Sequence, residues 1–416
     1  MTREDSTPQQ SAPSRGGSGR TAARAGASRV TLGLEKLSDE WLGRLSGARI
    51  GLICNQSSVD HDLRHAAELL RERKGIKLTA MFGPQHGIGG DVQDNMVESP
   101  HMVDRETGLP IYSLYSDTRE PDERMLRDID AFVFDMQDVG CRIYTFVYTL
   151  ANCMRAARQH GKRVVVCDRP NPINGVQVAG VVLDPEYKSF VGQFPIATRH
   201  GMTVCELAKL FNEHFGIGCD LELLPMEGWE RRHWLDDTDS PWVMPSPNIP
   251  TLDSTILFPG TVHVEGTQLS EGRGTTRPFE LVGAPYIDAA EYARRLEGLG
   301  LPGVYFRPAY FQPTFQKHAR VTCGGVQIHV TDREQFEPVI AGVATVKVAH
   351  DMYPDDFRWK EPPYEYEFEK NPFDVIAGTS RLRAQIEAGD SIETIQESWQ
   401  ASLEEFLRLR QNFLLY

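Results

Sequence analysis

The hydrophobic positions in the first half of the chain follow two patterns that alternate along the sequence. Short continuous apolar runs predict buried strands at residues 48–54, 78–82, 111–115, 131–136, 163–167 and 219–224. Between these runs, apolar residues recur at spacings of three and four, which predicts amphipathic helices. Buried strands separated by helices are typical of a mostly parallel sheet that is covered on both faces. The sequence therefore predicts an α/β fold with a Rossmann-like, doubly wound domain.

The helices between the strands can be placed by their ends and by their apolar stripes. One begins after Thr203, which can form a capping box with Glu206, and a short one begins near Asp122. The apolar stripes of two others consist of Leu63, Ala66, Ala67 and Leu70 in the first, and of Ile143, Phe146, Val147, Leu150, Met154 and Ala157 in the second, which Gly161 closes.

The pattern changes after residue 224. Residues 225–259 are rich in Pro, Trp and Asp, which predicts an ordered crossing loop with a domain boundary near Asp253. Beyond it we expect a helix near Ala289, strands near Val304 and at 325–332, a helix through Phe336, Val339, Ile340 and Val343, and a last helix with Ile392, Ile395, Trp399, Leu403 and Phe406 on one face. Residues 1–28 contain almost no large apolar side chains and are expected to be disordered. The predicted organisation is a tail at 1–28, a Rossmann-like domain at 29–253 and a smaller α+β domain at 254–416.

Composition and charge exclude several classes of partner. The formal net charge is -14 and the chain has no basic stripe, which disfavours nucleic acid and anionic membrane surfaces as partners. Its seven cysteines include no C-x-x-C pair and lie mostly in apolar stretches, as reduced core thiols do. The N-terminus lacks the apolar core of a signal peptide and no apolar run is long enough to span a membrane, so a cytoplasmic protein is expected.

The stretch from Phe82 to Glu98, FGPQHGIGGDVQDNMVE, contains more chemistry than a connector needs. It follows a predicted strand, and ligands of open α/β sheets bind beyond the carboxyl ends of the strands. Several other loops also present polar groups that would gather at this edge and suit a hydroxylated ligand such as a sugar. The candidates are Gln85, His86, Asp138, Arg142, Tyr144, Asp168, Asn171, His200, Asn248, Glu265, Glu271 and Arg273. For some of them a structural role is equally open, since Asp138 could cap a helix and Asp168 could belong to a plain turn.

Motifs for common cofactors are missing from the sequence. The residues after the first strand, NQSSVDHD, contain no G-x-G-x-x-G for a dinucleotide, and SEGRGTT at 270–276 lacks the lysine of a phosphate-binding P-loop. His61 and His65 have a spacing that a metal could use, but their context is that of an exposed helix and no zinc pattern occurs. We therefore expect neither a cofactor nor a metal.

A set of motifs resembles, in order and over roughly residues 48–416, the NamZ family of exo-acting β-N-acetylmuramidases. The motifs are GLICNQ, FGPQHGIGGD, QDVGCRIYT, DRPNP, SFVGQFPIATRHGMT, PSPNIPT, EGTQLSEGRGTTRPFE and TFQKH. The resemblance implies a Rossmann-like N-terminal domain, a smaller C-terminal domain and an active site in the cleft between them. It also implies release of terminal N-acetylmuramic acid from the non-reducing end of peptidoglycan fragments.

This chain departs from the family at the position of the proposed catalytic glutamate. The family motif is P-E-H-G, whereas Gln85 stands in PQHG here, and an amide cannot act as a carboxylic acid or base. Because glycoside hydrolysis usually needs two carboxyl groups, Glu98 and Glu271 are the first candidates to replace the missing one, and Asp91, Asp138 and Glu265 are further candidates. Substrate assistance by an N-acetyl group would reduce the requirement to one carboxyl, with Gln85 orienting that group. Arg142 or Arg273 is expected to bind the lactyl carboxylate, and His86 completes the catalytic candidates.

Three functions remain open on this evidence. The first is a glycoside hydrolase that acts on fragments containing N-acetylmuramic acid in cell-wall turnover or recycling. The second is a weakened or inactive relative that binds an amino sugar or a peptidoglycan fragment without turnover, as Gln85 would allow. The third is a Rossmann-like enzyme with different chemistry on another amino sugar or acidic sugar.

Overall fold

The computed structural model describes residues 26–37, 41, 43–94 and 96–416. Of the tail predicted at 1–28, residues 1–25 lie outside the described part. A seven-stranded sheet forms the N-terminal half, in the order β3-β4-β2-β1-β5-β6-β9. Its strands are β1 (Arg49–Cys54), β2 (Lys77–Gly83), β3 (Met102–Val103), β4 (Pro110–Ser113), β5 (Ala131–Asp135), β6 (Arg163–Cys167) and β9 (Asp220–Leu224). All neighbouring strands run parallel except β3, which pairs antiparallel with β4 at one edge. The doubly wound, mostly parallel sheet predicted from the sequence is confirmed.

Helices cover both faces of this sheet, so its strands are buried on two sides. β5 shows the alternation, because Ala131 and Val133 face one hydrophobic core while Phe132 and Phe134 face the other. The first core lies under the short helices η1 (Gly33–Lys36) and η2 (Gly43–Leu45) and under α2 (Ala66–Glu72). The second lies under α3 (Glu123–Leu126), α4 (Phe146–Gln159) and α5 (Val204–Glu213). All seven cysteines are unpaired and buried, as expected of reduced core thiols.

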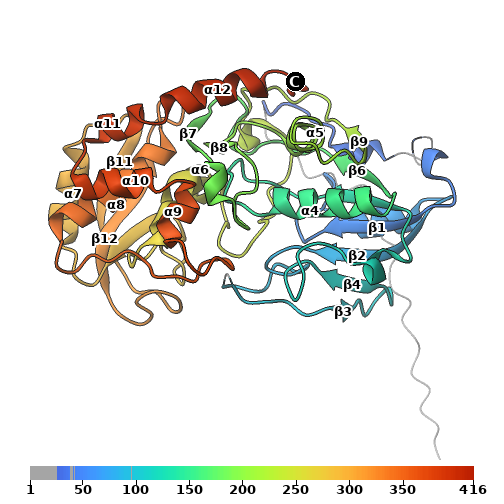
Figure 1. Cartoon of the computed structure of the whole chain (residues 1–416), viewed down its shortest axis with the longest axis horizontal. Helices are drawn as coiled ribbons and strands as arrows, with labels where there is room; N and C mark the ends of the chain where they lie inside the picture. Colours follow the sequence, from blue (N-terminus) through green and yellow to red (C-terminus); the bar gives the residue numbers. More distant parts are fainter. Residues whose placement is uncertain (1–25, 38–40, 42, 95) are drawn as a thin grey trace, which may run out of the picture.

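The C-terminal half contains a three-stranded antiparallel sheet in the order β10-β12-β11 (Figure 1). Its strands are β10 (Leu281–Ala284), β11 (Val304–Phe311) and β12 (Cys323–Val330), and its helices are α6 (Leu252–Thr261), α7 (Ala289–Glu297), α8 (Pro338–Met352), α9 (Pro372–Ala377), α10 (Arg381–Ala388), α11 (Ile392–Glu397) and α12 (Gln400–Arg410). Between the halves lie β7 (Ala179–Val182), β8 (Ala197–Arg199), η3 (Pro185–Tyr187), η4 (Leu235–Asp237) and η5 (Val262–Gly266). None of the helices in the described residues combines the length and apolar character needed to cross a bilayer.

The C-terminus returns to the N-terminal half, as α12 shows at the top of Figure 1. Arg410 donates a 2.7 Å hydrogen bond to the Gly201 carbonyl and a second bond to the Gly175 carbonyl. The hydroxyl of Tyr416 donates to Asp168 at 2.6 Å and accepts from the backbone N–H of Met226 at 2.6 Å. These bonds join the last residues of the chain to the loops that follow β6, β8 and β9.

Several predicted elements differ in detail from the observed ones. Leu63 lies outside α2 with φ of 60° and is 51% exposed, so the apolar stripe assigned to that helix starts too early. The last predicted helix is two helices, α11 and α12, although its five apolar residues are all buried as expected. The capping box predicted for Thr203 and Glu206 is present at the start of α5. Strands β3, β7, β8 and β10 were not predicted.

Candidate active site

A cavity lies where the N-terminal sheet meets the C-terminal half of the chain. The space open to water-sized molecules inside it is about 40 Å³, and its total empty space is about 480 Å³ when the open mouth is included. Its walls come from the loop after β2, the start of α4, residues 246–249, η5 and the segment after α8. The polar residues that line it are Gln85, His86, Tyr144, Thr145, Ser246, Asn248, Glu265, Arg273, Tyr364 and Glu365. The sequence had singled out six of these, namely Gln85, His86, Tyr144, Asn248, Glu265 and Arg273.

Gln85 is held in one orientation by hydrogen bonds on both sides of its amide. The Thr145 hydroxyl donates to Oε1 at 2.9 Å, and Nε2 donates to Oε1 of Glu365 at 3.0 Å. The bond to Glu365 joins residues 280 positions apart in the sequence. Gln85, at the position of the motif's glutamate, therefore contacts the carboxyl group of Glu365 inside the cavity.

Glu365 is the carboxyl that sequence analysis missed. It is 2% exposed, and its Oε2 accepts a 2.7 Å hydrogen bond from the hydroxyl of Tyr115. Burial raises the pKa of Glu365, and the nearby charge of Glu265 raises it further, although the hydrogen bonds from Tyr115 and Gln85 act in the opposite direction. A buried carboxyl with a raised pKa can keep its proton at higher pH than an exposed one, which is what a general acid requires.

Glu265 lies in a different environment within the same cavity. Its Oε1 accepts a 2.8 Å bond from Nη2 of Arg273, and its Oε2 accepts a 2.9 Å bond from the hydroxyl of Tyr364. Burial by itself would lower the pKa of Arg273, but the negative charges of Glu265 and Glu271 raise the pKa of Arg273 above its usual value. The cavity thus contains one carboxylate in an ion pair and one carboxyl, Glu365, whose two described hydrogen bonds come from neutral groups.

Glu271 lies behind this ion pair and does not line the cavity. Its Oε2 is 2.8 Å from Nζ of Lys317, and its Oε1 is 3.8 Å from Nε of Arg273. Burial alone would raise the pKa of Glu271, but Lys317 and Arg273 hold it below the usual value. Lys317 also donates to the carbonyls of Val264 and Leu269, so Glu271 helps to fix η5 and the loop that follows it.

His86 lines the cavity in the neutral form. It has φ of 71°, in the left-handed region, and its Nδ1 lies 2.8 Å from the carbonyl oxygen of Val92. Burial lowers the pKa of His86 to about 4, and the charge of Arg273 contributes in the same direction. Because Nδ1 faces a carbonyl acceptor, it carries the proton, which leaves Nε2 as an acceptor.

Tyr144 and Asn248 complete the group of predicted residues that line the cavity. The ring of Tyr144 packs against Phe146, with 4.6 Å between the ring centres. Asn248 donates from Nδ2 to the carbonyl of Gln93 at 2.8 Å, which ties residues 246–249 to the loop after β2.

The remaining candidates on the N-terminal domain lie away from the cavity. Asp138 and His200 are buried partners, with 3.4 Å between Oδ2 and Nε2. Arg142 is fully buried, and its Nη2 donates to the carbonyls of Ile376 at 2.8 Å and Ala377 at 3.0 Å. These contacts give Arg142 a role in joining α9 to the loop before α4.

Asp168, Asn171 and Glu98 also have partners elsewhere. Asp168 accepts bonds from Thr203, Cys205 and Tyr416, and burial raises its pKa to about 7 although these bonds oppose the shift. Asn171 donates to the carbonyl of Met202 at 3.0 Å. The side chain of Glu98 is 51% exposed and accepts a 3.1 Å bond from Tyr366. Asp91 is exposed as well.

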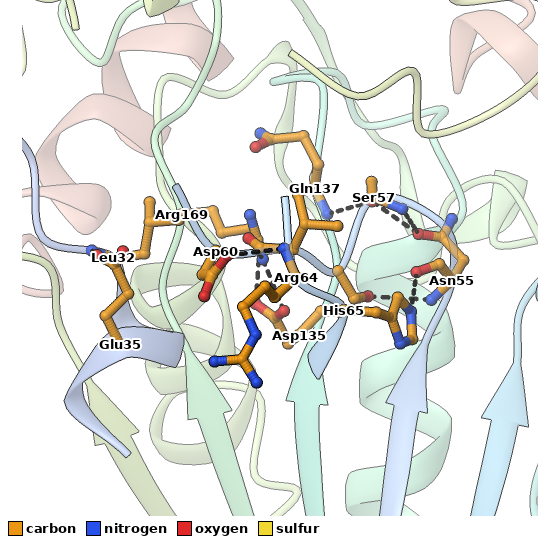
Figure 2. Close-up of polar contacts among 12 residues, drawn as sticks. Leu32, Glu35, Asn55, Ser57, Asp60, Arg64, His65, Asp135, Gln137 and Arg169 are labelled. Carbon is orange, nitrogen blue, oxygen red and sulfur yellow. Dashed lines mark hydrogen bonds and ion pairs between the residues drawn. The ribbon is translucent and has the colours of Figure 1, made fainter. Parts of the chain in front are cut away.

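A separate polar cluster lies at the carboxyl ends of β1, β5 and β6 (Figure 2). Arg169 donates to both carboxylate oxygens of Asp135 and to the carbonyl of Val59, each at 2.7 Å. Asn55 accepts a 2.7 Å bond from the Ser57 hydroxyl. After β1 the next strand, β2, is added toward one edge of the sheet, and after β5 the next strand, β6, is added toward the other edge. The strand order therefore reverses between β1 and β5, which is the switch point where doubly wound sheets usually bind ligands. In this protein, side chains that bond to one another occupy that position.

The two histidines considered for a metal also have protein partners. His61 lies 2.6 Å from Glu35 and 3.3 Å from Asp239. Nε2 of His65 lies 2.9 Å from the carbonyl oxygen of Asn55. Within the described residues, no three His, Cys, Asp or Glu side chains form a group that could hold a metal ion.

Known proteins resemble this chain over almost its whole length. A peptidoglycan β-N-acetylmuramidase NamZ of Bacillus subtilis (strain 168) is 46% identical over 388 residues, which cover 93% of this chain and 92% of that protein. Crystal structures of two DUF1343 family proteins of Bacteroides fragilis NCTC 9343 have the same fold. The first is 33% identical with a TM-score of 0.84, covering 93% of this chain and 99% of that one, and the second is 27% identical with a TM-score of 0.74, covering 94% and 99%.

Family models divide the chain into two matched parts. The N-terminal model of the exo-β-N-acetylmuramidase NamZ matches residues 50–253, and the C-terminal model matches residues 256–416. The cavity draws Gln85 and Asn248 from the first part and Glu265, Arg273 and Glu365 from the second. The chain belongs to the NamZ family of exo-β-N-acetylmuramidases, which are glycosidases.

Proposed function

We propose that this chain is an active glycoside hydrolase that removes terminal N-acetylmuramic acid from the non-reducing end of peptidoglycan fragments. The observation that carries the proposal is the pair of cavity-lining glutamates with contrasting surroundings. Glycosidases commonly need one carboxyl that gives a proton and one that stays charged, and their environments separate the two roles. Glu365 has the environment of the acid and Glu265 that of the charged partner.

In the proposed reaction, the proton of Glu365 passes to the glycosidic oxygen as the bond between that oxygen and C1 breaks. Water supplies the hydroxyl group that C1 receives and the proton that restores the acid. The charge of Glu265 either activates that water or stabilises positive charge on the sugar ring. Participation of the substrate's N-acetyl group is compatible with the same acid and would make Glu265 a stabilising group.

Gln85 would act as a positioning residue for the acid. Its amide is fixed by Thr145, so Nε2 points at Glu365 and sets the direction of the carboxyl group. An amide at this position does not remove the acid from the cavity, because Glu365 comes from another segment of the chain. This accounts for an active enzyme with PQHG in place of the family's P-E-H-G motif.

Arg273 is the group that we assign to the lactyl carboxylate of N-acetylmuramic acid. It lines the cavity, where its Nη2 donates to Glu265, and its Nε faces Oε1 of Glu271 at 3.8 Å. A planar guanidinium group at the wall of a cavity suits a carboxylate ligand. Arg142, the alternative considered from the sequence, is fully buried and does not line the cavity, and its Nη2 donates to the Ile376 and Ala377 carbonyls.

The proposal is tested by incubating the purified protein with the disaccharide in which N-acetylmuramic acid is linked to N-acetylglucosamine. Release of both free sugars is expected, and the Glu365→Gln variant purified in the same way serves as the control for contaminating enzymes. If the protein binds the disaccharide in calorimetry but releases no sugar, it is a binding protein and the hydrolase assignment is wrong.

A further inference from the structure

A groove of about 700 Å³ adjoins the cavity and has no part in the roles assigned above. Its walls are the segment 117–120, one side of α4, the segment 188–190, Gln193 and Tyr366. This volume lies within the usual range for small-molecule sites, about 300–1,000 Å³.

Two short segments of the chain contribute to the walls of both the groove and the cavity. Val191 lines the cavity while its neighbour Phe190 lines the groove, and Glu365 lines the cavity while Tyr366 lines the groove. Tyr115 packs beneath both, at 5.4 Å from the ring of Phe190 and 5.8 Å from the ring of Tyr366. The hydroxyl of Tyr115 also donates to Glu365, so one residue contacts both the proposed acid and the aromatic rings of the groove.

The groove changes in character with distance from the cavity. Aromatic rings, Phe190 and Tyr366, lie next to it, and Arg119 covers one face of Tyr366 at 3.5 Å from the ring centre. Lys188 follows further along the segment. Arg119 has Glu98 as an ion partner and Arg155 has Glu120, whereas Lys188 has none among the described residues.

Two further polar atoms of residues that line the groove lack protein partners. Nε of Arg119 and Oγ of Ser189 are buried and have no hydrogen-bond partner among the described residues. Buried donors without partners are uncommon in folded proteins and favour the presence of a ligand or of ordered water.

We infer that this groove binds the glycan on the leaving side of the scissile bond, so that the enzyme acts preferentially on chains longer than a disaccharide. This inference rests on the proposed function. In peptidoglycan the sugar beyond the bond is neutral N-acetylglucosamine, and the next sugar has a lactyl group whose carboxylate is free where the stem peptide has been removed. Aromatic side chains beside the cavity match the neutral sugar, and the uncompensated Lys188 matches the carboxylate of the following one.

The test compares kcat/KM on three substrates: an aryl N-acetylmuramide, the disaccharide, and the tetrasaccharide made of two such disaccharides. Contacts with a remote part of a substrate can increase the rate of the chemical step, so kcat/KM should be higher on the tetrasaccharide than on the disaccharide, which has the same first leaving sugar. Lys188→Ala should reduce kcat/KM on the tetrasaccharide by about tenfold, the effect of one charged hydrogen bond. The same variant should leave the disaccharide and the aryl glycoside unchanged.

Phe190→Ala should lower kcat/KM on both oligosaccharides, because Phe190 faces the first leaving sugar. Lys74→Ala, on an exposed turn after α2, is the matched control and should change nothing. A tetrasaccharide in which the third sugar is N-acetylglucosamine lacks the second carboxylate. On this substrate the Lys188→Ala variant and the wild-type protein should have the same kcat/KM.

The outcomes separate this inference from the proposed function. Failure of the wild-type protein to cleave any of the three substrates would contradict the proposed function itself. Cleavage of the disaccharide and the tetrasaccharide with equal kcat/KM would contradict the groove inference alone. Equal losses on the aryl glycoside and the tetrasaccharide in the Lys188→Ala variant would also contradict it, because the effect would then come from the cavity.

Discussion

The polar cluster at the switch point and the polar cluster in the cavity contain similar side chains, but these side chains have different hydrogen-bond and ion-pair partners. In the switch-point cluster, Arg169 donates two hydrogen bonds to Asp135, and both side chains are nearly inaccessible to solvent. In the cavity cluster, Arg273 pairs with Glu265 at the wall of the cavity, and Glu365 receives its two described hydrogen bonds from an amide and a phenol. Matched charges make a rigid junction, whereas a carboxyl among neutral donors keeps a proton available.

The two clusters also differ in where their residues come from. The switch-point cluster is built from loops at the carboxyl ends of neighbouring strands of one sheet. The cavity needs Gln85 from the loop after β2 and Glu365 from a segment after α8. Substitutions in the first cluster should therefore change stability, and substitutions in the second should change catalysis.

The largest expected effect is on stability, from Asp135→Asn. Removing the charge leaves the buried guanidinium of Arg169 without its counter-ion, and breaking a buried ion pair in this way costs about 3–5 kcal/mol in the free energy of unfolding. Urea denaturation measures the loss. Asp130→Asn is the matched control, because it removes an exposed ion pair with Arg49 and should have little effect. Equal losses in both variants would contradict the contrast between the clusters.

The next effect is on substrate binding, from Arg273→Lys. A lysine keeps the charge but cannot present two parallel donors to a carboxylate, so KM for an aryl N-acetylmuramide should rise by about tenfold or more. The matching N-acetylglucosaminide lacks the lactyl group and is the control substrate. If both substrates respond equally, Arg273 supports the cavity without recognising the lactyl carboxylate.

A smaller effect, on pH dependence, is expected from Gln85→Glu. Glu365 must be protonated to act, so activity falls as the pH rises through its pKa, which burial has already raised. A second carboxyl at the position of the Gln85 amide, 3.0 Å from Oε1 of Glu365, would disfavour ionisation of the pair. The alkaline limb of kcat should then move to higher pH. An unchanged or lower limb would show that Glu365 is not the titrating acid.

Much of the fold could be predicted because strands buried on both faces leave a strong signal. The run at 163–167 is apolar after its first residue and matches β6. β7 and β8 are only four and three residues long and lie outside the main sheet, so they have no such run. The apolar pattern also could not show that α11 and α12 are separate, because their buried residues continue one stripe across the break.

The site was less predictable, because a sequence pattern gives no indication of which side chain of a loop turns inward. Gln85 and His86 could be proposed from their place after a strand. Glu365 lies in the acidic stretch EPPYEYEFEK, which resembles a solvated loop, and it becomes visible only when Tyr115 and Gln85 are found beside it. The usable signal was the alternation of tyrosine with glutamate after two prolines. Arg142 shows the opposite error, because it was predicted to bind the ligand but instead donates to backbone carbonyls. A sequence motif does not indicate such backbone partners.

The most direct test of the central claim, that Glu365 is the general acid, uses two substrates with different leaving groups. The disaccharide releases a sugar alkoxide that needs a proton, whereas a 4-nitrophenyl N-acetylmuramide releases a stable phenolate. The account predicts that Glu365→Gln lowers kcat/KM on the disaccharide by about 10²–10⁴-fold, the usual contribution of general acid catalysis, and on the aryl glycoside far less. Equal losses on the two substrates would contradict it, because Glu365 would then be a structural residue.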